Sequence, residues 1–579
     1  MAEISIKAPR EGISASPHTG YADIRNCDIS SVPGIARLNN ILAKKSGATV
    51  DAQVKWFARD PDTSANIFAL DSVGTLYKSA DSGVTWAEPA NSTRGGAGQG
   101  LIVRWGYVFV FCDTTIDVMK ISDSTWTDDW QTIGTDSLWH PAFVSKNDGK
   151  IYFGCGRYVG SIEQLSTFVP GTPATYTVTL GTSANNALDL PSAYRIKCIE
   201  ELGNDLRMGT WQGTNVYDVR EAVMFSWDRS SVSFGQPVVI PEYGVHAMKN
   251  VGNSLIVLAG TTGTIYRSDG VNATIIGKLP IDLSGGKYIE YYPGSLTYYK
   301  NKIFFGIGHT ALTVGGVATT IAGMGVYSLE TTSKGNILNL EHLPSTLTDG
   351  SAASVKCTAL LPISDETLLV GWATSGVVTM TIADPCVVTL ASHGFIDGTA
   401  ILFTTTGALP TGITASTYYY IRSTGTNTFN LYDTAAHAIA GGATGRVATT
   451  GTQSGVHTMA SYGIDLTTEA SFAYGTDYSG YFESPLYNVG SLLRQVTPTE
   501  IEFNLARPLR TDEAVRLAYR TDLTASYTTI ATHTFATAGA VVSVNTVYDF
   551  PPCEQIQFRV SLKGTATTSP ELKNISIRW

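Results

Sequence analysis

One pattern recurs seven times between residues 51 and 376: a polar turn of Asn, Asp, Gly or Lys leads into a short apolar strand. These strands begin at Ile67, Tyr107, Ile151, Leu206, Leu255, Ile303 and Leu368, with spacings of 40, 44, 55, 49, 48 and 65 residues. Repeats of this length, each with room for four short strands, are typical of propeller blades. The pattern therefore predicts a seven-bladed β-propeller. Six blades is the nearest alternative, because the stretch around Leu206 is long and irregular.

The first repeat ends in residues 79–86, which read S-A-D-S-G-V-T-W. Ser79 and Asp81 can hydrogen-bond turn amides, Gly83 can supply a left-handed backbone angle, and Trp86 can return to the apolar layer. With Thr85, these residues make an S-x-D-x-G-x-T-W phrase that resembles the Asp-box turn of propeller blades, first noted in sialidases. The resemblance implies a scaffold turn on the face away from a sialidase active site. We therefore expect Asp81 to be a structural acceptor, and an ordinary Asp/Gly hairpin is the alternative.

The composition is typical of an all-β protein. Only 15% of the 579 residues are charged, whereas 57 are Gly and 28 are Tyr. This balance favours strands and turns over helices. The net charge of −10 argues against a basic nucleic-acid-binding surface, but it suits a wall past which DNA slides without sticking.

Residues 1–20 lack the apolar core of a signal peptide, and the chain has no run of 18 apolar residues. The sequence therefore predicts a soluble chain made in the cytoplasm. Its seven cysteines lie far apart and form no C-x-x-C pair. We expect them to be reduced and mostly buried.

Patterning divides the chain into four parts. Residues 1–50 are rich in turn formers and predict an extended arm, in which residues 36–45 could form two helical turns. Residues 51–376 with 460–466 predict the propeller, and 460–466 is expected to be the missing outer strand of the last blade. Residues 377–459 contain no Lys or Glu and predict an inserted β module. Residues 467–579 alternate apolar and polar positions and predict a C-terminal β-sandwich, with Trp579 buried.

The inserted module carries three phrases in order: H-G-F at residues 393–395, T-T-T-G-A-L-P-T-G at 404–412, and Y-Y-Y at 418–420. This order resembles a small β module that recurs in bacteriophage tail proteins. The resemblance covers about 80 residues. It implies a virion protein and says little about chemistry.

A propeller invites comparison with sialidases, which need an arginine cluster, a Tyr nucleophile with a Glu partner, and an acid. The F-R-I-P motif of that family is absent, and Arg104, Arg157, Arg195 and Arg207 come from different repeats. The nine histidines show no H-E-x-x-H motif or close pair at metal spacing, and neither a P-loop nor a G-x-S-x-G elbow occurs. We expect no catalytic residue, no cofactor and no metal, and therefore no enzyme.

The arm contains N-C-D-I-S-S-V-P-G-I-A-R at residues 26–37, and the last strand starts with a Ser-Pro pair at 569–570. A P-G-x-x-R arm, a propeller and a sandwich with a final Ser-Pro strand are together similar to the tail hub or nozzle (tail tubular) proteins of short-tailed bacteriophages. The resemblance implies a homo-oligomeric ring of six copies that continues the genome-ejection conduit below the tail adaptor. The implied assembly arm includes Asn26, Pro33, Gly34 and Arg37.

The same resemblance implies the location and the partners. The chain would be made in the host bacterial cytoplasm and placed in the virion tail, next to the adaptor and to tail fibre or spike proteins. Genomic DNA would pass without sequence-specific binding. The insert at 377–459 departs from that family's pattern. The alternative is a tail-attached receptor-binding or fibre-anchoring protein that binds a host surface glycan, and a propeller glycosidase is less favoured.

Overall fold

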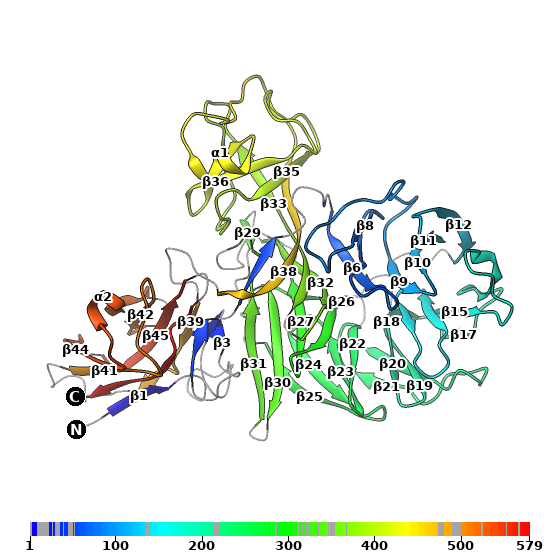
Figure 1. The fold of residues 1–579 in the computed structure, drawn as a ribbon, viewed down its shortest axis with the longest axis horizontal. Helices are drawn as coiled ribbons and strands as arrows, with labels where there is room; N and C mark the ends of the chain where they lie inside the picture. The colour runs from blue at the N-terminus through cyan, green and yellow to red at the C-terminus, as the bar shows by residue number, and fades with distance from the viewer. Residues whose placement is uncertain are drawn as a thin grey trace.

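In this computed structural model the described residues are 3–7, 23–25, 27–28, 35–38, 40–44, 50, 52–134, 139–212, 221–279, 281, 283, 287–309, 312–314, 317–319, 321, 324–332, 335–345, 347, 354–365, 367–472, 480–488, 499–522, 525–551, 553–565 and 568–578. They form three β bodies, which Figure 1 shows as a propeller on the right, a small barrel at the top and a sandwich on the left. No helix among these residues is long and apolar enough to cross a membrane.

Each propeller blade is an antiparallel meander that starts at the ring axis and runs outward. The first four blades are, in this order, β6 (Val54–Arg59), β7 (Ile67–Asp71) and β8 (Leu76–Ser79); β9 (Gly100–Arg104), β10 (Tyr107–Phe111), β11 (Thr115–Lys120) and β12 (Trp126–Thr132); β13 (Ala142–Val144), β14 (Ile151–Cys155), β15 (Tyr158–Gln164) and β16 (Tyr176–Thr179), with β17 (Leu188–Asp189) beside β15 and a 3-10 turn η1 (Pro173–Thr175); β18 (Tyr194–Leu202), β19 (Asp205–Gln212), β20 (Ala222–Trp227) and β21 (Val238–Ile240).

The last three blades follow the same plan. They are β22 (Val245–Val251), β23 (Ser254–Ala259), β24 (Thr264–Ser268) and β25 (Ala273–Lys278); β26 (Glu290–Tyr299), β27 (Lys302–Gly308), β30 (Val326–Thr332) and β31 (Gly335–His342), with a hairpin of β28 (Leu312–Val314) and β29 (Val317–Thr319); and β32 (Val355–Pro362), β33 (Leu368–Met380), β38 (His457–Phe472) and β5 (Asn40–Lys44).

The prediction of a seven-bladed, all-β propeller is confirmed. The innermost strands contact one another in blade order, and β32 contacts β6, so the ring is closed. The seven apolar strand starts recognised in the sequence all lie in the second strand of a blade. That strand packs between the neighbouring blades, and every residue of β7, β10 and β14 is buried. Burial on both faces explains why these strands read as apolar runs rather than as alternating patterns.

The last blade is completed by a strand from the other end of the sequence. Residues 460–466 lie in β38, which is the third strand of the blade and not its outer one. The outer strand is β5, whose Lys44, Ala43 and Leu42 pair with residues 465–467. The expectation of helical turns at 36–45 was wrong. A helix this short is marginal by itself, whereas the open edge of β38 supplies backbone hydrogen bonds to an extended chain.

The insert is a small closed barrel between β33 and β38. It contains β34 (Val387–Thr389), β35 (Ala400–Thr405), β36 (Tyr419–Gly425), β37 (Thr428–Tyr432) and the helix α1 (Ala435–Ala440). The pairings run from β33 through β34, β37, β36 and β35 to β38, which pairs with β33 again. Closure leaves no free sheet edge. The barrel also contacts the propeller, because Tyr418 donates a hydrogen bond to the Val50 carbonyl at 2.8 Å.

The sandwich packs two sheets around one core. One sheet is β1 (Glu3–Lys7), β46 (Leu572–Arg578), β41 (Thr499–Leu505) and β44 (Ser543–Tyr548). The other contains β39 (Gly480–Glu483), β40 (Tyr487–Asn488), β45 (Gln555–Lys563), β42 (Ala514–Arg520) and β43 (Thr528–Thr534), which the short helix α2 (Phe535–Ala538) follows. Buried side chains from both sheets meet in a core that includes Phe503, Leu517, Phe558 and Ile575.

Where the structure describes residues 1–50, they are not a projecting arm. β1 is a strand of the sandwich, and β2 (Asp23–Arg25) pairs with β39 of the sandwich and with β31 of the propeller. β3 (Cys27–Asp28) and β4 (Arg37–Leu38) form a hairpin whose Cys27 and Leu38 are in the sandwich core. The apolar residues of the segment are buried there, which explains why it does not project. Asn26, Pro33, Gly34 and Trp579 lie outside the described residues.

Candidate functional site

The Asp-box residues form the turn after β8, the third strand of the first blade. The Asp81 carboxylate accepts hydrogen bonds from Thr85 N at 2.8 Å, Thr85 Oγ1 at 2.6 Å and Ser79 Oγ at 2.8 Å. Gly83 has φ +89°, and its amide donates to Ser79 Oγ at 2.8 Å. Trp86 is buried, and its Nε1 donates to the Gly83 carbonyl at 3.0 Å. Asp81 therefore acts as a turn acceptor.

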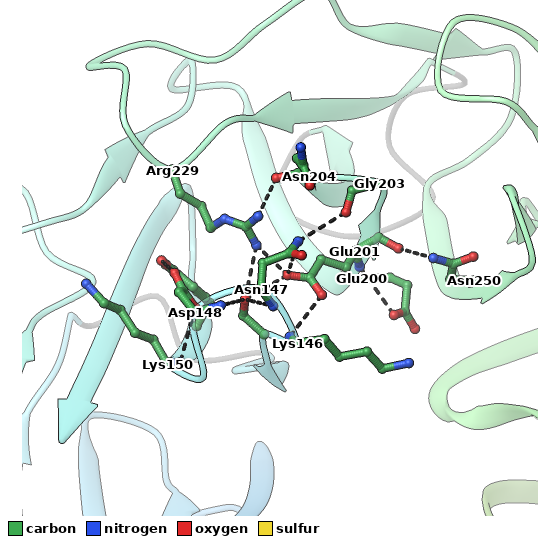
Figure 2. Close-up of polar contacts among 12 residues, drawn as sticks. Lys146, Asn147, Asp148, Lys150, Glu200, Glu201, Gly203, Asn204, Arg229 and Asn250 are labelled. Carbon is green, nitrogen blue, oxygen red and sulfur yellow. Dashed lines mark hydrogen bonds and ion pairs between the residues drawn. The ribbon is translucent and has the colours of Figure 1, made fainter.

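A second polar cluster joins blades 3, 4 and 5 around the buried Glu201 (Figure 2). Its carboxylate accepts hydrogen bonds from Ser145 Oγ at 2.7 Å, Lys146 N at 3.0 Å and Asn147 Nδ2 at 3.1 Å, and it pairs with Arg229. The main-chain carbonyl of Glu201 accepts from Asn250 Nδ2 at 2.6 Å. With its oxygens occupied by blade turns, Glu201 acts as a structural connection between blades rather than as an acid or base.

The ring axis carries polar residues that β-bulges aim inward. The innermost strands of blades 1, 4, 5 and 7 each shift register at one residue, and these residues are Lys55, Lys197, His246 and Thr358. A bulge places two residues opposite one and redirects the side chain of the extra residue. Four blades thus use the same device at the same place in the strand.

Two of these bulge residues form a buried basic cluster. Lys197 is 4% exposed, and its Nζ lies 2.7 Å from Nδ1 of His246. The Nζ atoms of Lys55 and Lys197 lie 4.6 and 5.0 Å from the ring centroid of Trp139. Lys55 also donates to Gln99 Oε1 at 3.0 Å. Contact with an aromatic ring partly offsets the loss of water around an ammonium group.

Burial shifts the titration of these groups toward their neutral forms. Desolvation lowers the pKa of Lys197 to about 7, and it lowers the pKa of Lys55 to about 8 against the opposing charges of Asp113 and Asp71. Desolvation and the Lys197 charge lower the pKa of His246. An uncharged amine is a nucleophile or a proton acceptor in principle. Lys197 is nevertheless enclosed and bonded to His246, so the observed arrangement favours a structural role.

An axial cavity of about 420 Å³ lies next to this cluster and is lined by the innermost strands of all seven blades. Its walls are mainly apolar, and its rim carries Arg59, Arg104, Glu200 and Lys249. Arg59 and Arg104 end β6 and β9, and the Asp-box turn follows the end of β8. The first and third strands of a meander end on the same face, so the rim and the Asp-box turn share one face of the propeller.

The four arginines considered for a sialidase site do not converge. Arg157 Nε pairs with Asp189 at 3.2 Å, Arg195 donates to the Ser192 carbonyl at 2.7 Å, and Arg207 donates to the Gly270 carbonyl at 2.9 Å. Arg104 alone lies at the cavity rim. Among the described residues, no group of three His, Cys, Asp or Glu side chains could hold a metal ion.

Sequence reasoning missed the axial lysines and Glu201. Lys55, Lys197, His246 and Thr358 precede the recognised strand starts by 12, 9, 9 and 10 residues, so a polar residue at that offset was a usable signal. Glu201 offered no such signal, because its partners lie 28 to 56 residues away.

Comparisons with known proteins add a fold-level likeness. No family model matches the chain, and no curated protein does. Among solved structures, the RRP9 WD40 repeats are 9% identical and cover 58% of this chain and 92% of their own, with a TM-score of 0.38. YCF48 bound to D1 peptide is 10% identical and covers 57% and 92%, with a TM-score of 0.37. The designed Ika8 protein is 13% identical and covers 56% and 96%, with a TM-score of 0.33. The strand pairings, and not these distant likenesses, carry the fold assignment.

Proposed function

We propose that this chain is a structural protein of a bacteriophage tail, a nozzle or hub whose copies form a ring below the tail adaptor. The ring continues the conduit through which the genome leaves the virion. The motif resemblance of the arm, the insert and the final Ser-Pro strand supports this proposal. The overall charge of −10 suits a wall that DNA passes without binding.

The observation that carries the proposal is the path of the N-terminal strands. β2 joins β39 of the sandwich to β31 of the propeller, and β5 closes the last blade. Domains within one chain usually move relative to one another unless a large interface holds them. Backbone pairing across the boundary favours one stiff body, which is what a particle wall requires.

The two short stretches that carry the resemblance also meet in the fold. Leu38 N donates to Ser569 Oγ at 2.7 Å, and Ala36 forms a β-bridge with Leu572. The P-G-x-x-R segment and the Ser-Pro strand are therefore parts of one structural unit of the sandwich. This contact gives a physical reason for the two motifs to occur together in one chain.

Electron microscopy of the purified full-length chain tests the proposal. We expect closed rings, and mass photometry should give the number of copies directly. A chain that stays monomeric both alone and with the purified tail adaptor contradicts the nozzle function. Rings of a number other than six would revise the symmetry and leave the conduit role standing.

A receptor-binding or fibre-anchoring role is the second candidate, and the inserted barrel favours it. The barrel projects away from the propeller (Figure 1) and exposes Ile382, Ile396, Ile439 and Val456. Replacing residues 379–456 with Asn-Gly leaves Val378 and His457, which pair in the structure, on either side of a two-residue turn. Phage particles with this variant should assemble and adsorb normally if the chain is a nozzle. Loss of adsorption with intact assembly would favour the adhesin.

A further inference from the structure

The axial cavity has the form of an enclosed ligand site. Leu101, Val103, Phe143, Val144, Leu296 and Leu361 are among its lining residues. Trp56 lines the cavity and meets Trp139 edge to face, with ring centroids 6.4 Å apart. Its volume of about 420 Å³ lies within the usual range for small-molecule sites. A hydrocarbon chain is the ligand part that such walls recognise.

The rim has an excess of positive charge. Of its four charged residues, Lys249 and Glu200 pair with each other at 3.3 Å, which leaves the two arginines. Arg59 Nε donates only to the Ser64 carbonyl, at 2.9 Å, among the described residues. The Arg104 guanidinium lies 5.6 Å from the Trp105 ring centroid, and its buried Nε has no hydrogen-bond partner in the part of the chain described.

Guanidinium groups present a planar fork of N–H donors that matches a carboxylate. The combination of an apolar chamber with two arginines at its mouth fits a ligand with an apolar body and one anionic end. We propose that the axial cavity binds a medium-chain alkyl carboxylate, with the hydrocarbon chain inside the ring and the carboxylate at Arg59 and Arg104. This binding activity is separate from the ring-forming function proposed above.

Isothermal titration of the full-length protein with decanoate tests the inference, with decanol as the uncharged probe. We expect one decanoate per chain and about tenfold weaker binding of decanol, since a hydrogen bond to a charged group contributes on this scale. Absence of decanoate binding overturns the inference. Equal affinity for decanol also overturns it, because the arginines would then play no part.

Two variants separate the chamber from the rim. Val144→Trp fills the chamber and should abolish decanoate binding, whereas Val239→Trp changes an exposed valine of β21 and should leave the affinity unchanged. Arg104→Gln keeps the volume and should weaken decanoate about tenfold while leaving decanol unchanged. Its matched control is Arg157→Gln, which removes a pair with Asp189 away from the cavity. Circular dichroism checks folding, and undiminished decanoate binding by a folded Val144→Trp or Arg104→Gln protein overturns the inference.

Discussion

Asp81 shows how one side chain fixes a blade turn. Its carboxylate holds both the amide and the hydroxyl of Thr85. Desolvation acts to raise the pKa of Asp81, but the hydrogen bonds from Thr85 and Ser79 outweigh it and lower the pKa below its ordinary value of 3.8. The turn therefore prefers the charged carboxylate.

We predict that Asp81→Ala lowers the free energy of unfolding by about 1 kcal/mol at pH 7, because an exposed turn acceptor contributes modestly. Urea denaturation measures this, with the exposed Asp62→Ala as the control. A folded pKa below the unfolded pKa gives stability that is present above 3.8 and is lost as the pH falls through the folded pKa. The difference between the two proteins should therefore vanish in acid. A difference that persists there would contradict the hydrogen-bond account.

Lys197 gives the opposite kind of pH dependence. Its pKa is about 7 in the fold and 10.5 in the ordinary state, because burial disfavours the ammonium form. Between these values the unfolded chain binds the proton more readily, so wild-type stability rises with pH over this window. Below pH 7 the burial penalty is present in full.

We predict that Lys197→Met raises the free energy of unfolding at pH 6 by a few kcal/mol, on the order expected when a buried charge is removed. The gain should shrink as the pH rises from 7 towards 10.5. Urea denaturation at pH 6, 8 and 10 measures it, and Lys120→Met, at a surface pair, is the control. A variant that is less stable than wild type at pH 6 would show that the His246 bond outweighs desolvation.

At the scale of elements, the N-terminal strands have separable roles. β1 pairs only within the sandwich, whereas β5 completes the last propeller blade. Nine of the ten tryptophans lie between residues 56 and 372, so tryptophan fluorescence reports mainly on the propeller. The two regions can therefore be followed with different probes in one chain.

We predict that deletion of residues 1–44 lowers the urea midpoint of tryptophan fluorescence, because the edge of β38 loses its partner and the ring its closure. Deletion of residues 1–7 is the matched control and should leave that midpoint near the wild-type value. Equal midpoints for the two deletions would mean that β5 does not stabilise the ring.

At the scale of the whole molecule, charge determines how the assembled protein meets DNA. A net charge of −10 gives long-range repulsion of the phosphate backbone at low salt. We predict that the full-length protein does not retain a fluorescent DNA duplex in anisotropy titrations at 20 to 200 mM salt, concentrations chosen because basic DNA-binding proteins bind strongly there. Binding that weakens steeply with salt would reveal a basic surface and contradict the passive-wall function.

The sequence determined the propeller, the blade number and the Asp-box turn, because these depend on local turn chemistry and on apolar runs that every blade repeats. Tertiary structure alone decided that residues 40–44 close the ring, because an edge strand acquires its partner only after the last blade has formed. It also decided that Lys197 is buried on His246, 49 residues away, where the sequence offered only a polar residue within a strand. Such contacts join distant parts of the chain, so no local pattern records them.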